Sequence, residues 1–190
     1  MDMTKLQIFD FDDTLFRVPS YTSKTQVEAL GFEFGGPYEY YDHSISLDET
    51  LNNIQLISPV YDAWKKGKQD PDCKQVLITH RVEEVQESVN SILEARKIDF
   101  DHRFFLGRAI PKITATEATM DEMPQLKDIE IYEDSVHQII QYQEFFKKQN
   151  DRRVKAKLAP YVVKIYIVDK SKMYRIENLK LSEEKKIVLI

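Results

Sequence analysis

The stretch LQIFDFDDTLF, Leu6 to Phe16, combines a short apolar run with a cluster of acidic residues. Its apolar residues predict a buried strand, and Asp10, Asp12 and Asp13 follow where that strand should leave the sheet. Carboxylates this close together raise one another's pKa unless a cation such as Mg²⁺ neutralises them. Asp10 and Asp12 are two residues apart, so an extended segment presents both to one metal and one substrate.

Composition limits the class of protein. The 190 residues, 42% hydrophobic and 31% charged, predict one soluble globular domain over residues 1–190. A net charge of -5 argues against a globally basic nucleic-acid-binding protein but allows a local basic patch. A single cysteine excludes an intramolecular disulfide and a CxxC zinc site, and no apolar run has the length of a membrane span. We therefore expect a cytoplasmic protein without a membrane partner; the oligomeric state stays unknown.

Strand-like and helix-like segments alternate along the chain, which predicts an α/β fold. Further strands are expected at 75–80, 104–106, 129–132 and 161–168, and helices at 82–93, 114–123 and 136–146. The predicted architecture is a Rossmann-like three-layer sandwich with a mainly parallel sheet. The tail, 171–190, mixes charged residues with an apolar end, and it either adds an edge strand or contacts a partner.

The connection between the first two strands is unusually long. Roughly 60 residues exceed an ordinary connection, so we expect an insertion at 17–72 that forms a small cap or flap. Within it, a short helix is expected at 23–30. Ser46 and Glu49 have the form of a capping box, which predicts a second helix, and 58–67 is expected to be a third.

Polar residues also follow two of the later strands. They are Thr79, His80 and Arg81 after one strand and Glu133 and Asp134 after another. Ligands of open α/β sheets bind at the carboxyl ends of the strands, so these side chains are expected to meet the first acids in one crevice. Such a group of hard oxygen ligands favours Mg²⁺ over zinc.

The segment from Asp10 to Thr14 resembles the DxDx[TV] signature of the haloacid dehalogenase (HAD) superfamily, whose members are mostly Mg²⁺-dependent phosphohydrolases. The strand ending in Thr79 is similar to the second motif of that family. The pair Glu133 and Asp134 is similar to the fourth motif, and the motifs occur in the family's order. The third motif supplies a basic residue.

This resemblance implies roles for individual residues. Asp10 is implied to attack phosphorus and form an aspartyl-phosphate, while Asp12 protonates the leaving group and then activates water. Thr79 and Lys112 are implied to hold the phosphoryl oxygens, with Arg108 as the substitute for Lys112. The implied Mg²⁺ ligands are Asp10, the backbone carbonyl of Asp12, Glu133 and Asp134. The candidate substrate-binding residues are Thr14, His80, Arg81, Arg108 and His137.

The segment IYEDSVH, Ile131 to His137, is similar to the fourth motif of Swiss Army Knife RNA-repair-type HAD domains. Ser135 stands where that branch usually has Arg. The resemblance implies removal of phosphate from nucleic-acid ends or nucleotide-like substrates. The basic run from Lys147 to Lys157 either serves such a partner or is a solvated helix end.

The sequence therefore predicts a Mg²⁺-dependent phosphomonoester hydrolase whose phosphorylated substrate is a nucleotide or a nucleic-acid end. Two alternatives remain open. One is a non-catalytic Mg²⁺- and phosphate-binding module on a HAD scaffold, because such residues permit chemistry without proving it. The other is a receiver-type phospho-acceptor domain, which would carry its acceptor on a middle strand.

Overall fold

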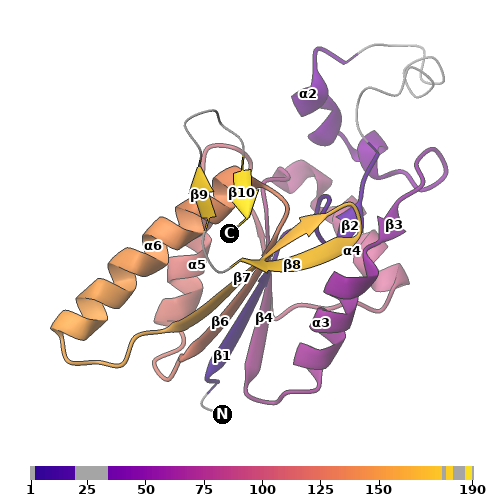
Figure 1. The fold of residues 1–190 in the computed structure, drawn as a ribbon. Helices are drawn as coiled ribbons and strands as arrows, with labels where there is room; N and C mark the ends of the chain where they lie inside the picture. Colours follow the sequence, from indigo (N-terminus) through magenta and orange to yellow (C-terminus); the bar gives the residue numbers. More distant parts are fainter. Residues whose placement is uncertain (1–2, 20–33, 177–178, 182–186, 190) are drawn as a thin grey trace.

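A six-stranded sheet forms the middle of the computed structural model (Figure 1). In spatial order its strands are β5 (His102–Phe105), β4 (Cys73–Thr79), β1 (Lys5–Phe9), β6 (Asp128–Glu133), β7 (Val162–Asp169) and β8 (Lys172–Ile176). All neighbouring strands are parallel except β7 and β8, which form an antiparallel hairpin. The predicted α/β fold with a mainly parallel sheet is confirmed.

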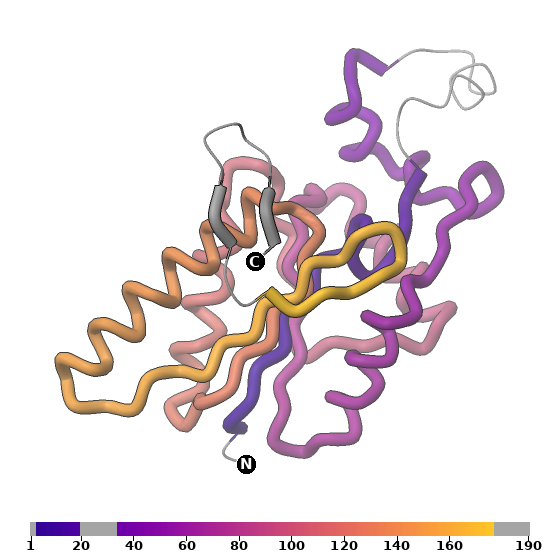
Figure 2. Tube along the Cα trace, in the orientation of Figure 1, coloured from indigo at the N-terminus to yellow at the C-terminus, as the bar shows by residue number. Residues whose placement is uncertain are grey.

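Helices cover both faces of the sheet (Figures 1 and 2). Helices α3 (Ser58–Lys68) and α4 (Gln86–Ala95), the latter preceded by the 3-10 helix η2 (Glu83–Val85), pack on one face. Helices α5 (Lys112–Asp121) and α6 (Val136–Lys155) pack on the other. Each face encloses its own apolar core, so the molecule is the expected three-layer sandwich.

Strand β1 lies in the centre of the sheet, between β4 and β6. Its side chains alternate between the two cores, with Phe9 in one and Leu6 and Ile8 in the other. Both faces of β1 are covered, which explains why it reads as a nearly continuous apolar run. Strands β1, β4 and β6 are parallel and in register, so Asp10, Thr79 and Glu133 come to the same edge of the sheet.

The structure describes residues 3–19 and 34–176, together with the backbone of 179–181 and 187–189. Strand β2 (Phe16–Arg17) follows the acidic turn and pairs with β3 (Gln55–Leu56). Between them, helix α2 (Pro37–Tyr41) and the 3-10 helix η1 (Ser44–Leu47) project beyond the edge of the sheet (Figure 1). The helix expected at 23–30 lies outside the described residues.

The predicted insertion, 17–72, contains two kinds of structure. Helix α3 buries Val60 and Trp64 in the core and covers the sheet. The described residues before it, 34–56, lie beside the carboxyl edge of the sheet. The assignment of residues 17–72 to a cap insertion therefore stays a prediction, and 34–56 is the segment that fits a cap.

The helix predicted from Ser46 and Glu49 is wrong. Only the 3-10 helix η1 forms there, and the side chain of His43, not Ser46, accepts the capping hydrogen bond from Ile45. The Ser46 hydroxyl instead donates to the His43 carbonyl. Asp48 then accepts from the backbone N–H of Thr50, a local turn that competes with helix formation.

The C-terminal tail supplies an edge of the sheet, which is one of the two roles predicted for it. The strand expected at 161–168 is confirmed as β7, and β8, which lies within the tail 171–190, is the edge strand beside it. The apolar end of the tail forms β10 (Ile187–Leu189), which pairs with β9 (Leu179–Leu181) in a separate two-stranded sheet.

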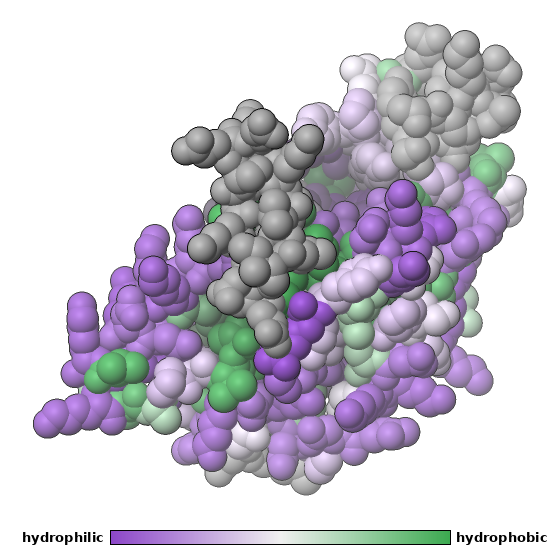
Figure 3. Space-filling view, in the orientation of Figure 1, coloured by the Kyte–Doolittle hydropathy of each residue, from purple (hydrophilic) through white to green (hydrophobic). Residues whose placement is uncertain are grey.

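The face shown in Figure 3 is largely hydrophilic, with apolar side chains gathered near its centre. No helix in the described ranges has the length and apolar character needed to cross a membrane.

Candidate active site

A buried lysine joins the first acidic motif to the second. Lys112, the first residue of α5, places its Nζ 2.7 Å from Asp10 Oδ1 and 2.6 Å from Glu133 Oε2. Its side chain is only 3% exposed, and those of its two partners are 9% and 2% exposed. The other oxygen of Glu133 accepts the backbone N–H of Ser135 at 3.0 Å. Glu133 thus fixes Lys112 against Asp10.

Asp10, Glu133 and Asp134 form a compact carboxylate cluster. Each offers an oxygen, and these three oxygens lie within 4.8 Å of one another. The hydroxyl of Thr14, which is fully buried, lies 3.3 Å from Asp134 Oδ1 and 3.5 Å from Asp10 Oδ2. One lysine cannot neutralise three carboxylates, so the donor set fits a hard divalent cation.

Burial and charged neighbours shift the pKa values of the residues in this cluster. Burial raises the pKa of Asp10; Lys112 opposes the shift and Glu133 adds to it. Burial also raises the pKa of Asp134, and Asp10 and Glu133 raise it further. Burial alone would lower the pKa of Lys112, but Asp10 and Glu133 reverse that effect and raise it. Lys112 therefore stays an ammonium ion, and a metal cation bound at the cluster would lower the pKa of Asp10 and Asp134.

Asp12 faces a different cation, Arg81. The guanidinium donates from Nε to Asp12 Oδ2 at 2.9 Å and from Nη2 to Asp12 Oδ1 at 2.6 Å, a two-point contact. Its Nη1 donates to Ser46 Oγ at 2.6 Å and to the carbonyl of Tyr41. Arg81 is buried, so it ties the orientation of Asp12 to the segment that carries α2 and η1.

Thr79 and His80 line the same small hollow as the carboxylate cluster. The Thr79 oxygen accepts the backbone N–H of Arg81 at 3.1 Å, which leaves its O–H for another acceptor. Burial and the charge of Lys112 lower the pKa of His80, so its ring is neutral at pH 7. This hollow has a volume of about 170 Å³, room for a phosphoryl group but not for a large leaving group.

Two further hollows adjoin the first. One, of about 200 Å³, is bounded by Asp12, His80 and Arg81 on one side and by Tyr38 and Tyr41 on the other. A larger one, of about 680 Å³, shares Asp134 with the carboxylate cluster. A substrate can therefore extend from the small hollow in either of two directions.

Two predicted residues lie apart from the cluster. Arg108 is in the 200 Å³ hollow, where it pairs with Asp42 at 2.8 Å and lies 4.0 Å from the ring centre of Tyr38. Lys112, not Arg108, is the basic residue beside Asp10. His137 is exposed on α6, lies 3.0 Å from Gln141, and lines none of these three hollows. Its predicted contact with substrate has no support from this position.

Sequence reasoning missed the partners of Arg81. Ser46 and the Tyr41 carbonyl join this group from a segment whose secondary structure was predicted incorrectly. Every residue type has a backbone carbonyl, so the contact of Arg81 with the Tyr41 carbonyl could not be predicted from residue identity. The larger hollow was also missed, because it depends on the hairpin of β7 and β8.

The fold and the order of the motifs define a protein of the HAD superfamily, as the resemblance implied. The family described as HAD domain family 1 in Swiss Army Knife RNA repair proteins matches residues 58–189, and the chain belongs to it. The match begins after the first motif, so Asp10 and Asp12 lie outside the matched range. No curated protein matches the chain.

Solved structures with a similar fold include a chain of the Pnkp1/Rnl/Hen1 complex, at 16% identity and a TM-score of 0.49 over 87% of this chain and 45% of the other. A chain of the Pnkp1/Rnl/Hen1 RNA repair complex has 18% identity and a TM-score of 0.48, over 87% and 43%. The HAD domain of the effector protein Lem4 from Legionella pneumophila has 17% identity and a TM-score of 0.44, over 86% and 85%. The chain spans less than half of the length of the first two.

Proposed function

We propose that this protein is a Mg²⁺-dependent phosphomonoester hydrolase that acts through an aspartyl-phosphate and takes a phosphate from a nucleotide or a nucleic-acid end. The observation that carries the proposal is the contact of one buried lysine with Asp10 and Glu133, beside the carboxylate of Asp134. Lys112 lowers the pKa of the nucleophile Asp10, which favours its ionised form, and offsets phosphoryl charge. Membership in a family of RNA repair domains supports the choice of substrate.

In this mechanism the site residues divide the work between attack, proton transfer and binding of the phosphoryl group. Asp10 attacks phosphorus, which moves the phosphoryl group to its carboxylate and breaks the bond to the leaving oxygen. Asp12 gives that oxygen a proton and later takes one from the water that attacks phosphorus, which breaks the bond to Asp10 and releases inorganic phosphate. The Thr79 hydroxyl and the Lys112 ammonium bind the phosphoryl oxygens. Asp10, Asp134 and the backbone carbonyl of Asp12 would hold Mg²⁺, with Glu133 as a direct or water-mediated contact; the ion would screen the repulsion between nucleophile and phosphate.

Adding Mg²⁺ is expected to raise the melting temperature, and Asp134→Asn is expected to remove most of that rise. At one hundred times its Kd, the ion would add about 2.7 kcal/mol to the free energy of unfolding. The raised pKa values of Asp10 and Asp134 also determine how the stability of the metal-free protein changes with pH. Without metal, the folded chain holds protons that the unfolded chain has released above about pH 4, so stability falls as the pH rises.

Because Mg²⁺ binds ionised carboxylates, its effect on the melting temperature should grow from pH 6 to pH 8. Thermal unfolding with and without Mg²⁺ at several pH values measures this. An equal rise in the Asp134→Asn variant would contradict the assigned ligand.

Arg81→Lys is expected to slow the hydrolysis of alkyl phosphates more than that of an aryl phosphate. Lysine keeps the charge but cannot make the two-point contact that orients Asp12. Proton donation contributes about 10²-fold or more for a poor leaving group such as an alcohol, and little for nitrophenol. Rates with a nucleoside monophosphate and with nitrophenyl phosphate test this; equal losses would mean that Arg81 does not act through Asp12.

The reaction itself is tested by phosphate release in the presence of Mg²⁺. The panel contains nitrophenyl phosphate, mononucleotides, sugar phosphates, and oligonucleotides with a 3′ or a 5′ phosphate. The proposal expects turnover that depends on Mg²⁺ and is fastest with nucleotides or oligonucleotides. No turnover by folded, Mg²⁺-binding protein would favour the non-catalytic binding module instead.

A further inference from the structure

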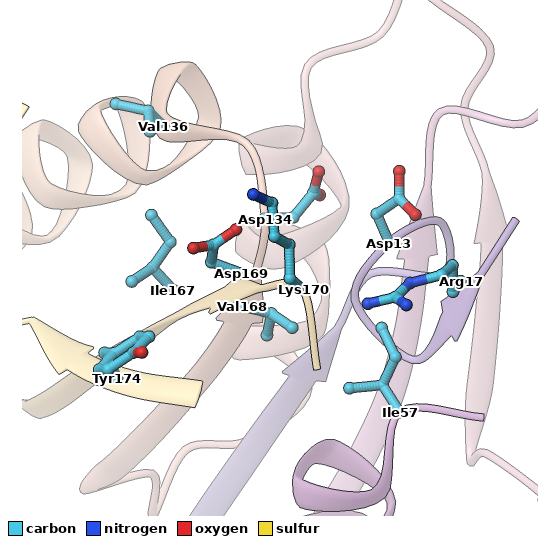
Figure 4. A pocket seen from close by; sticks show the side chains of 10 residues that line it. All are labelled: Asp13, Arg17, Ile57, Asp134, Val136, Ile167, Val168, Asp169, Lys170 and Tyr174. Atoms are coloured by element: carbon cyan, nitrogen blue, oxygen red, sulfur yellow. The ribbon is translucent and has the colours of Figure 1, made fainter. Parts of the chain in front are cut away.

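The hollow of about 680 Å³ beside Asp134 has no role in the reaction as described above. Figure 4 shows the side chains that line it, which come from the acidic turn, β2, the residue before α3, the segment between β6 and the start of α6, and the hairpin of β7 and β8. Its volume is in the range of pockets that hold small organic molecules. Because it shares Asp134 with the carboxylate cluster, a group bound there lies next to the reacting phosphate.

One part of this hollow is apolar and aromatic. Ile57, Val136, Ile167 and Val168 line it together with Tyr174. The Tyr174 side chain is 42% exposed and has no ring contact within the described part of the chain. An exposed ring beside an apolar wall suits a flat partner such as a nucleobase.

The hollow also contains two cations. Lys170 and Arg17 both line it, and in Figure 4 the Arg17 guanidinium extends across the hollow toward the hairpin. Arg17 donates one hydrogen bond to Ser171 Oγ at 2.8 Å. Lys170 forms no ion pair with any residue that the structure describes, so its ammonium is available to an anionic ligand.

The backbone at Lys170 is unfavourable for lysine. Lys170 and Ser171 form the two-residue turn between β7 and β8, and their φ angles are 47° and 80°. Both positions of such a turn favour Asn or Gly, since a side chain destabilises left-handed backbone. The turn places Lys170 in the lining of the hollow beside the reaction centre, so its ammonium can reach a ligand bound there.

We propose that, when the substrate is a nucleic-acid end, this hollow binds the terminal nucleoside and the adjoining phosphodiester of the leaving group, while the leaving oxygen lies beside Asp12 in the small hollow. This inference rests on the proposed phosphatase function. The terminal nucleoside lies on Tyr174 and the apolar wall, and the adjoining phosphodiester lies between Lys170 and Arg17. Asp13 and Asp169 also line the hollow, so the anion is confined to the space between the two cations. A sugar phosphate offers neither the flat ring nor the second anion.

The test compares Lys170→Asn with Lys97→Asn. Lys97 is a matched control: it is exposed, has a φ of 55°, follows the end of α4, and lines none of the three hollows. Both substitutions remove one positive charge and relieve the same backbone strain. The measured quantity is kcat/KM for a phosphorylated oligonucleotide divided by kcat/KM for nitrophenyl phosphate, which has no second anion.

Lys170→Asn is expected to lower this ratio by roughly tenfold, as for loss of one phosphate contact, without lowering the melting temperature. Lys97→Asn should leave the ratio unchanged. An equal ratio in both variants, or a larger loss with Lys97→Asn, would overturn the assignment of the hollow while the phosphatase function stands.

A binding measurement separates this proposal from the reaction. Fluorescence anisotropy of a labelled, phosphorylated oligonucleotide with Asp10→Asn protein needs no turnover. Adding Lys170→Asn should weaken binding and reduce the slope of log K against log salt by about 0.7, the value for one phosphate contact to a single strand. An unchanged slope would overturn the role of Lys170 whether or not the protein hydrolyses phosphate.

Discussion

Asp10→Asn is expected to abolish turnover, with a loss of at least about 10⁴-fold in kcat, while the protein stays folded. An amide cannot attack phosphorus, and it is a weaker ligand for Mg²⁺ than a carboxylate. The fold should persist because Lys112 keeps its ion pair with Glu133 at 2.6 Å. Removing one of three crowded carboxylates also relieves repulsion, so the melting temperature without Mg²⁺ should hold or rise.

The measurement is phosphate release alongside thermal unfolding for Asp10→Asn and for Asp151→Asn. Asp151 is exposed on α6, so its variant makes the same chemical change far from the cluster. Full activity in Asp10→Asn protein would refute the assignment of the nucleophile. An unfolded variant would contradict the account of the ion pair.

Lys112→Met is expected to destabilise the protein and to inactivate it. Methionine keeps a similar volume but leaves Asp10, Glu133 and Asp134 without the cation that contacts them. Breaking a buried ion pair by removing one partner lowers the free energy of unfolding by about 3–5 kcal/mol, because an uncompensated charge remains. Chemical denaturation without Mg²⁺ measures the effect.

The double variant Lys112→Met with Glu133→Gln separates stability from activity. Gln removes the negative charge that depended on Lys112, so part of the lost stability should return. Activity should not return, because no ammonium then faces the phosphoryl oxygens. Recovery of both would mean that Lys112 has only a structural role, and unchanged stability in the single variant would contradict the burial of the ion pair.

The fold could be predicted from the sequence because the sheet is covered on both faces. Strands β1, β4 and β7 then appear as largely apolar runs, β6 alternates apolar and polar residues, and helices α4 and α6 show regular apolar spacing. Prediction was wrong where local hydrogen bonds outweigh such spacing. At Ser46 the hydroxyl serves Arg81 and the His43 carbonyl, and Asp48 starts a turn, so the capping-box pattern does not produce a helix.

The candidate site was predicted as far as parallel strands bring residues together. Asp10 follows β1, and Thr79 and Glu133 end the neighbouring strands β4 and β6. Because these strands are parallel, the three residues lie at one edge of the sheet whatever path the connecting segments take. The position of Lys112 depends on where α5 begins, and the sequence left Arg108 as a substitute. The pairing of Arg81 with Asp12 depends on the long connection before α3, whose path no local pattern determines.

The most direct test of the central claim is detection of phosphate on Asp10. Protein mixed with Mg²⁺ and substrate would be quenched in acid during turnover, and its peptides examined by mass spectrometry. The account predicts one phosphoryl group on the peptide that contains Asp10, none in the Asp10→Asn variant, and loss of the group at least as fast as kcat. Turnover without this phosphopeptide would contradict the aspartyl-phosphate mechanism, and a phosphopeptide that outlasts many turnover times would point to a phospho-acceptor domain.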